Sequence, residues 1–423
     1  MRPDDHPLRQ WAVDEMHLRR FAPVPPHCEI FQSVRLIEAQ DRDREDRMLI
    51  GDKPPFDEWR LASRDATGSH AGGIIFLWER HTEASTLTLI FPHECPADVR
   101  APYIAWMEQW VGSVVRATRV FVIPDQDEVN NISAAKGMDV SDQVCSDVNG
   151  GIRIWSDFSL RDDGYGRLIV SAGNVSDAER GRIVQRLQEL GNYRNLALLG
   201  LSTVQHYGPQ ADKLEEELSD HADRVARMQD SAQDDRLLQE LIEISSRLEV
   251  IRSATGFRLS ATAAYADVAA DRLQALEVRP VPNRQSLAEF TERRLVPAAR
   301  TCAVFTDRLA RIAERISRVM HTLDVRVDTR IKAQNLILTK RMERSIQLQF
   351  RLQSLIEALS VIAAAYYLIG LVKFLVAGAA AWPFGSTTDL VIGAITIPAI
   401  AAIYAFVRHS RGNVLKEEDL DTD

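Results

Sequence analysis

Two long stretches near the C-terminus are apolar at almost every position. Residues 358–372 carry no charge, and the apolar run continues past Lys373 to residue 381. A second uncharged run covers residues 390–407. A helix needs roughly 20 residues to cross about 30 Å of hydrocarbon, and a lysine near its end can extend to the lipid headgroups. The pattern therefore predicts a two-helix transmembrane hairpin formed by residues 358–381 and 390–407.

The segments around this hairpin predict its orientation. The linking sequence AWPFGSTTD contains proline, glycine and small polar residues, as expected of a short turn at the membrane surface. Basic side chains outnumber acidic ones before the first span, and Arg408 and Arg411 follow the second. By the positive-inside rule, both termini are expected in the cytoplasm, with only the short turn on the other side of the membrane. Two buried helices of a soluble core are the disfavoured alternative, because such helices seldom lack charge over this length twice in succession.

The region before the first span has the periodicity of packed helices. Residues 298–369 contain neither glycine nor proline, which allows one helix on the order of 100 Å long. Two apolar stripes repeat every 3.5 residues, as in a coiled coil, and a turn at RPVPN, residues 279–283, separates them. The stripes are Leu237, Leu241, Ile244, Leu248 and Ile251, and Phe305, Leu309, Ile312, Ile316, Val319 and Leu323. An intrachain three-helix bundle with residues 176–230 and self-association of the stalk both explain them.

The N-terminal part of the chain has the pattern of an α+β domain with a mostly antiparallel sheet. Runs rich in Val, Ile, Phe and Thr, separated by turn signals, predict strands at 29–39, 74–79, 85–91, 119–123, 151–158 and 167–171. Residues 97–116 are expected to form a helix between strands. A further helix is expected at 176–204, where Ser176 caps the start and Glu179 follows three residues later.

The expected organisation has four parts. A cytoplasmic α+β domain (1–175) is followed by a long helical stalk (176–357), the transmembrane hairpin (358–407) and an acidic tail (408–423). The net charge of -9 argues against nucleic-acid binding, which needs a surplus of basic residues. The four cysteines lie far apart, without the spacing of a disulfide framework or a zinc site, and the N-terminus lacks the apolar core of a signal peptide. These features indicate reduced thiols in a cytosolic compartment.

Three short motifs contain residues that could take part in catalysis or in ligand binding, and each has a simpler structural explanation. In WERHTE, strand alternation places Glu79, His81 and Glu83 on one face, which favours a charge cluster over a general acid and base pair. HEC, at residues 93–95, has no second pair of metal ligands at a known spacing. DDGYGR, at residues 162–167, lacks the lysine of a phosphate-binding loop and suits a hairpin turn. We therefore predict no catalytic, cofactor-binding or metal-binding residues and no enzyme activity.

Polar residues inside the first predicted span are the candidate functional positions. Tyr366, Tyr367 and Gly370 fall within the hydrocarbon region, and Lys373 is expected to reach the outer interface. A tyrosine hydroxyl in lipid needs a partner or water, and glycine permits close approach of helices. These residues either line a pore or pack helices together, and the pattern leaves both uses open.

The chain resembles a bacterial family of membrane-anchored proteins that is classed only as a domain of unknown function. The resemblance covers nearly the whole chain and implies no catalytic residues. It also implies that the two-span hairpin lies in the inner membrane of a bacterial cell. It is carried by DHPLRQWAVDEMHLRRFAPV, WERHTEAST, DDGYGRLIV, GRIVQRLQELGNYRNLALLGL, VPNRQSLAEFTERRLVPAARTC and LQSLIEALSVIAAAYYLIGLV.

The architecture is also similar to that of CorA-type magnesium channels, in which a long stalk helix continues into the first of two spans. AAAWPFGSTTD stands where those channels carry Gly-Met-Asn, so this resemblance implies topology and not magnesium selectivity. Two hypotheses follow. The first is a homo-oligomeric interaction or scaffold protein anchored in the lipid bilayer. The second is a two-span channel or transporter with the tyrosines beside the conduction path.

Overall fold

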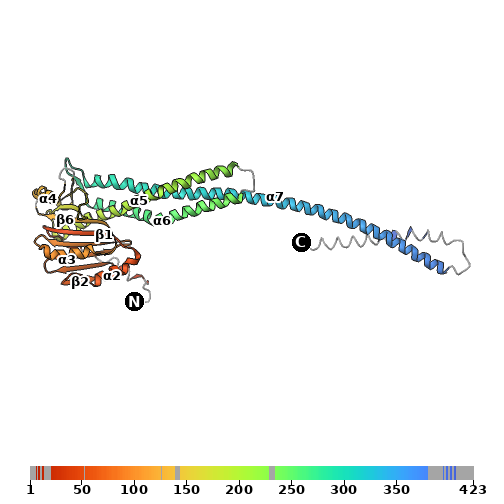
Figure 1. Cartoon of the computed structure of the whole chain (residues 1–423), viewed down its shortest axis with the longest axis horizontal. Helices are drawn as coiled ribbons and strands as arrows, with labels where there is room; N and C mark the ends of the chain where they lie inside the picture. The colour runs from red at the N-terminus through yellow and green to blue at the C-terminus, as the bar shows by residue number, and fades with distance from the viewer. Residues whose placement is uncertain are drawn as a thin grey trace. The chain divides into compact units, whose positions relative to one another are not determined.

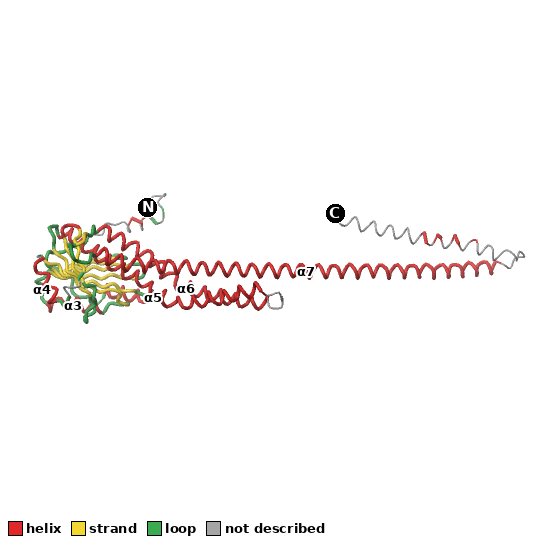
Figure 2. Tube along the Cα trace, turned by 90° about the horizontal axis from the view of Figure 1, so that it is seen from above, coloured by secondary structure: helices red, strands yellow, loops and turns green. Residues whose placement is uncertain are grey.

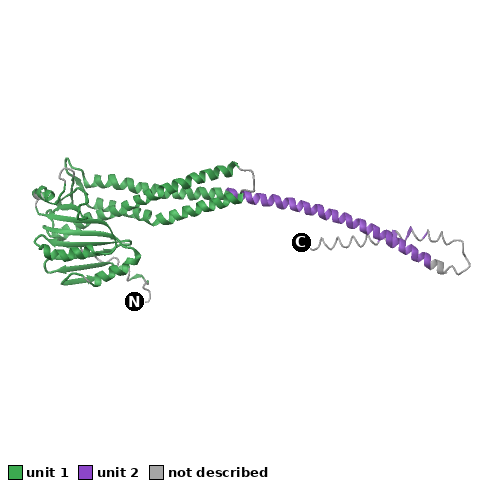
Figure 3. Ribbon diagram, viewed as in Figure 1, with its two compact units in different colours: residues 1–321 green, residues 322–423 purple. Residues whose placement is uncertain are grey.

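The computed structural model describes residues 6, 8–9, 12–13, 21–51, 53–124, 126–138, 143–227, 234–379, 394, 397–398, 401–402 and 404–405. The chain divides into two compact units, residues 1–321 and residues 322–423 (Figure 3). The boundary falls within the last long helix, α7 (Leu287–Ala379). The four-part division expected from the sequence, with boundaries at 175, 357 and 407, stays a prediction.

The first unit contains a ten-stranded sheet in the order β10-β7-β8-β9-β6-β1-β5-β4-β3-β2 (Figure 1). Neighbouring strands are antiparallel except for the parallel pair β6 and β9. The α+β class and the mostly antiparallel sheet are therefore confirmed. The strands are β1 (Cys28–Leu36), β2 (Glu58–Leu61), β3 (Asp65–His70), β4 (Ile74–Arg80), β5 (Ala84–Pro92), β6 (Ser113–Ile123), β7 (Val144–Val148), β8 (Ile152–Ser156), β9 (Gly166–Ser171) and β10 (Arg279–Pro280).

Helices connect and flank these strands. The short ones are α2 (Arg42–Ile50), α3 (Ala97–Glu108) and α4 (Val129–Ala135), with 3-10 turns η1 (Ala39–Asp41), η2 (Gln126–Glu128) and η3 (Asn149–Gly151). The long ones are α5 (Asp177–Arg227), α6 (Asp234–Ala275) and α7. Ser176 caps α5 as predicted, because its Oγ accepts a hydrogen bond of 3.3 Å from the Glu179 amide.

Six strands were predicted and all six are present, but four others were missed. Strands β2 and β3 are short, polar and partly exposed, so they lack the apolar run that signals a strand. The helix expected at 97–116 was too long, since α3 ends at Glu108 and β6 begins at Ser113. Gly112 separates them with φ of 86°, and a Cβ there would lie 2.3 Å from the Leu36 carbonyl oxygen. Only glycine fits this reversal.

The two faces of the sheet are covered by different helices, as Figures 1 and 2 show. Strand alternation sends Ile30 to one face, where Ile183 and Leu187 of α5 pack, and Phe31 to the other. That second face holds an aromatic core with Phe76, Trp78 and Phe91 of the sheet, closed by residues of α2 and α3 such as Leu49 and Trp106. The first unit is thus a layer of long helices, a sheet and a layer of short helices.

Helices α5, α6 and the start of α7 form a bundle within the first unit. The stripe of α6 is buried, and so is the stripe of α7, in which only Val319 is intermediate. A Cβ added at Gly200 of α5 would meet both Thr262 of α6 and Cys302 of α7, and Arg308 of α7 pairs with Asp212 of α5 at 2.7 Å. The intrachain three-helix bundle is therefore the correct alternative here, and RPVPN is the turn before α7. Helix α5 also continues beyond the expected end at 204, through Pro209.

The four cysteines are free and buried. Burial raises the pKa of the Cys28 thiol to about 12 and raises the pKa values of the Cys95, Cys145 and Cys302 thiols. A thiol whose pKa is raised by burial is a poor nucleophile, because the thiolate is the reactive form. The cysteines therefore act as small apolar residues of the core.

Candidate functional site

The apolar end of α7 carries the residues singled out from the sequence. Among the residues that the structure describes, one helix, Leu287–Phe374, is long and apolar enough to cross a membrane. Nearly all of the most apolar part of this helix is exposed. Residues 358–379 of the first predicted span belong to α7, whereas most of the second span, 390–407, the link before it and the tail at 408–423 lie outside the described residues.

One stripe of exposed apolar side chains runs along this part of α7. Its members, from 60% to 76% exposed, are Leu348, Leu352, Leu355, Leu359, Ile362 and Tyr366. Their spacings of 4, 3, 4, 3 and 4 are those of a coiled-coil seam. The same spacing continues through Gly370 and Lys373. The stripe was missed in the sequence, although the 3.5-residue period from Leu348 onward is the signal that reveals it.

Three of the four candidate positions therefore lie on one face of α7. Tyr366, Gly370 and Lys373 continue the stripe, and Tyr367 is the neighbour of Tyr366, with ring centroids 6.1 Å apart in an edge-on arrangement. Both tyrosines are more than 70% exposed. A Cβ at Gly370 would meet no atom within 4 Å. Their use in a pore or in helix packing stays a prediction.

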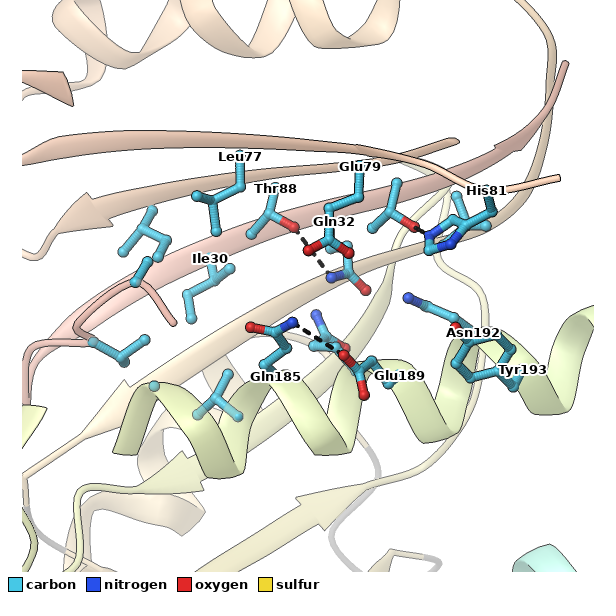
Figure 4. Close-up of a pocket in the computed structure, with 18 of the residues that line it drawn as sticks. Ile30, Gln32, Leu77, Glu79, His81, Thr88, Gln185, Glu189, Asn192 and Tyr193 are labelled. Carbon is cyan, nitrogen blue, oxygen red and sulfur yellow. Dashed lines mark hydrogen bonds between the residues drawn. The ribbon is translucent and has the colours of Figure 1, made fainter. Parts of the chain in front are cut away.

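A small pocket, with apolar walls and several polar side chains, lies between the sheet and α5 in the first unit (Figure 4). The Gln32 amide nitrogen donates to Thr88 Oγ1 at 3.1 Å, and His81 Nε2 lies 3.0 Å from Thr86 Oγ1. From the α5 side, the Gln185 amide donates to Glu189 at 3.0 Å. The volume of about 60 Å³ has room for a few water molecules and none for a metabolite. This pocket is a hydrogen-bonded part of the interior.

The WERHTE segment contributes to this pocket and to an ion pair beside it. Glu79 and His81 both line the pocket, and Glu83 pairs with Arg258 of α6 through two hydrogen bonds of 2.8 and 2.6 Å. Arg80 lies 3.3 Å from Glu45 in the opposite layer. Glu79 and Arg80 therefore point to opposite faces, as predicted. Strand β4 ends at Arg80, however, so His81 and Glu83 belong to the turn before β5 and not to a strand. The bidentate pair with Arg258 ties the sheet to α6, which the sequence did not indicate.

The other two motifs, HEC and DDGYGR, make contacts that belong to the local fold. The His93 ring stacks on the His27 ring with centroids 3.5 Å apart, and Cys95 is buried. No group of three His, Cys, Asp or Glu side chains suited to a metal ion occurs in the described part of the chain. DDGYGR forms the turn between β8 and β9, in which Asp163 accepts a hydrogen bond of 3.1 Å from the Tyr165 amide and Gly164 has φ of 78°. The predicted turn is therefore confirmed.

A comparison with protein-family models matches residues 4–414 to a protein family of unknown function, DUF3422. The chain belongs to this family. The match spans nearly all of the chain, so it includes the sheet, the bundle and the apolar end of α7, and it confirms the resemblance to a family of unknown function. The resemblance to CorA-type channels has no such support. No curated protein matches the chain.

Proposed function

We propose that this protein is a homo-oligomeric interaction or scaffold protein that is anchored in the bacterial inner membrane by residues 358–381 and 390–407. Its termini and its first unit face the cytoplasm. It acts by holding other molecules near the membrane and not by catalysis.

The observation that carries the proposal is the exposure of the apolar end of α7. The side chains of Leu359, Ile362, Leu371 and Phe374 are between 64% and 85% exposed, although the contact of such apolar side chains with water is unfavourable. Helices of a soluble core bury such residues, whereas a helix in lipid exposes them to hydrocarbon. A bilayer around residues 358–379 would cover this surface.

The exposed stripe that begins at Leu348 supports association of copies of this chain. It starts about ten residues before the predicted span, where polar residues such as Gln347, Gln349 and Arg351 lie between the apolar ones. A coiled-coil seam that is exposed along a whole stretch of helix needs a partner with the same period, and a second copy of α7 has that period.

Membrane anchoring is tested by extraction of membranes with alkaline carbonate. We expect the full chain to stay in the membrane fraction. The double substitution Leu368→Lys with Leu371→Lys should shift a large part of it to the supernatant, because each charge at mid-membrane costs about 2.5–3.5 kcal/mol on insertion scales. The matched control, Ile337→Lys with Leu338→Lys in the polar part of α7, should leave the protein in the membrane. Extraction of the unaltered chain by carbonate would contradict the anchoring.

Association is tested by the mass of the protein in lipid nanodiscs. We expect a multiple of the 47.6 kDa chain mass. Leu352→Glu combined with Leu355→Glu should reduce it towards one chain, because like charges would face each other across the seam. Phe350→Glu is the control, since this exposed side chain lies off the stripe. A single-chain mass for the unaltered protein would rule out the oligomer.

A further inference from the structure

A second cavity in the first unit is large enough for a ligand. Its volume is about 930 Å³, and its walls come from β6, β8, β9, α5, the first turns of α7 and the loop after β8. Apolar side chains make up most of the wall, and they include Leu160, Leu168, Leu187, Leu190, Leu198 and Leu201. Cavities of this size and composition are typical of sites for small organic molecules.

Arg194 of α5 lines this cavity, and no carboxylate among the described residues pairs with it. Its side chain is buried, with 7% of the residue exposed, and its guanidinium carbon lies 4.6 Å from the ring centre of Phe158 and 5.4 Å from that of Phe290. Within the described ranges, the structure gives this guanidinium no hydrogen bond and no ion pair. Burial lowers the pKa of Arg194 to about 10. An arginine in the interior is normally paired with an anion, because an unpaired buried charge is costly.

Arg116 of β6 is a second cation of the same cavity. Within the part of the chain that the structure describes, its partners are neutral side-chain amides: it donates to Gln32 at 3.1 Å, to Gln188 at 2.8 Å and to Asn192 at 2.7 Å. Burial first, and the positive charge of Arg194 second, lower the pKa of Arg116 to about 9. Gly191 makes room for this guanidinium, since a Cβ there would lie 2.7 Å from its central carbon.

The other charged groups of the wall do not neutralise these two arginines. Asp157 pairs with Arg161, and Arg167 pairs with Asp163. Arg294 of α7 adds a further positive charge at an exposed position of the wall. Three arginines of the cavity therefore lack a carboxylate partner among the described residues.

One aromatic residue of the cavity wall, Phe158, has a strained backbone conformation. Phe158 has φ of 51°, a left-handed conformation that a bulky residue seldom adopts and that costs on the order of 1–3 kcal/mol. Its ring stacks on Phe290 with centroids 4.2 Å apart, and this pair forms the surface on which Arg194 lies. Such conformations concentrate at ligand sites, where they fix a side chain in place.

From this geometry we infer that the cavity binds an anionic amphiphile, a molecule with one carboxylate or phosphate group and a hydrocarbon chain. The anionic group lies against Arg194 and Arg116, where charge-assisted hydrogen bonds replace the missing counter-ion. The hydrocarbon lies along the leucine wall. The site is formed wholly by residues 1–321, so it does not depend on how the protein is anchored.

The inference is tested by equilibrium dialysis of the full chain in phosphatidylcholine nanodiscs, with empty nanodiscs as background. The probes are octanoate, octyl phosphate, octanol and inorganic phosphate. We expect octanoate or octyl phosphate to bind at least tenfold more tightly than octanol and than inorganic phosphate. Equal affinity for octanol would overturn the role of the arginines, and equal affinity for inorganic phosphate would overturn the role of the leucine wall. Absence of binding by both anionic probes would overturn the site.

A pair of variants locates the site. Arg194→Gln should weaken binding of the anionic probe at least tenfold, whereas Arg300→Gln should leave it unchanged, because Arg300 is an exposed arginine of α7 that does not line the cavity. Unchanged affinity in a folded Arg194→Gln protein would overturn the assignment. Should that variant fail to fold, the four probes on the unaltered chain still decide the outcome.

Discussion

Replacing Glu45 with alanine is expected to lower the free energy of unfolding by about 3–5 kcal/mol, because two buried indole donors lose their acceptor and two arginines lose one of their partners. The Glu45 side chain is fully buried. Its Oε1 accepts hydrogen bonds from the indole nitrogens of Trp78 at 3.1 Å and Trp110 at 3.3 Å. Its Oε2 lies 3.0 Å from Arg42 and 3.3 Å from Arg80. One carboxylate therefore joins α2, the sheet and the segment after α3.

The loss is measured by denaturant unfolding of the full chain, followed by circular dichroism. Glu45→Gln should have a smaller effect than alanine, because the amide oxygen still accepts from an indole although the charge is lost. Asp43→Asn on the same helix is the control: Asp43 is exposed, and its substitution should change the unfolding free energy by less than about 0.5 kcal/mol. If Glu45→Ala unfolds like the control, the carboxylate does not hold these layers together.

Gly200→Ala is expected to destabilise the helical bundle by about 1–3 kcal/mol, the usual cost of overpacking. A Cβ at this position would lie 2.1 Å from Thr262 Oγ1 and 3.2 Å from Cys302 Sγ. The hydroxyl cannot move away freely, because it donates to the Ala197 carbonyl at 3.1 Å. The crossing of α5, α6 and α7 therefore depends on the absence of a side chain.

The control substitution is expected to change the unfolding free energy in the opposite direction. Gly256 lies inside α6, and a Cβ there would meet nothing within 4 Å. Gly256→Ala should raise the unfolding free energy by about 0.5–1 kcal/mol, because alanine loses less backbone entropy in a helix. The two thermal midpoints, measured on the full chain, should therefore move in opposite directions. A rise in both would show that the bundle is loosely packed at Gly200.

The helical part of the fold was largely predictable. The 3.5-residue stripes of α6 and α7 indicated packed helices, because burial of one face imposes that period. The same pattern could not choose between an intrachain bundle and self-association, since both bury the same stripe. Contacts such as that between Gly200 and Cys302 decide this, and they join residues about one hundred positions apart.

The charged interior was not predictable. RDREDRMLI, the sequence of α2, reads as a solvated helix, yet Glu45 is its most buried charged residue. The helix itself was missed for the same reason. Arg116 and Arg194 likewise give no local signal, because each is one of many arginines in the sequence and only the packing of β6 against α5 brings them to one cavity.

The sequence by itself determined where apolar side chains repeat. From this come six of the strands, the stripes of the bundle and the apolar end of α7, because the period of burial is a local property of a helix or strand. Only the tertiary structure decided which charges are buried and what they face. The free energy of a buried charge depends on its partners in space, and those partners come from distant parts of the chain.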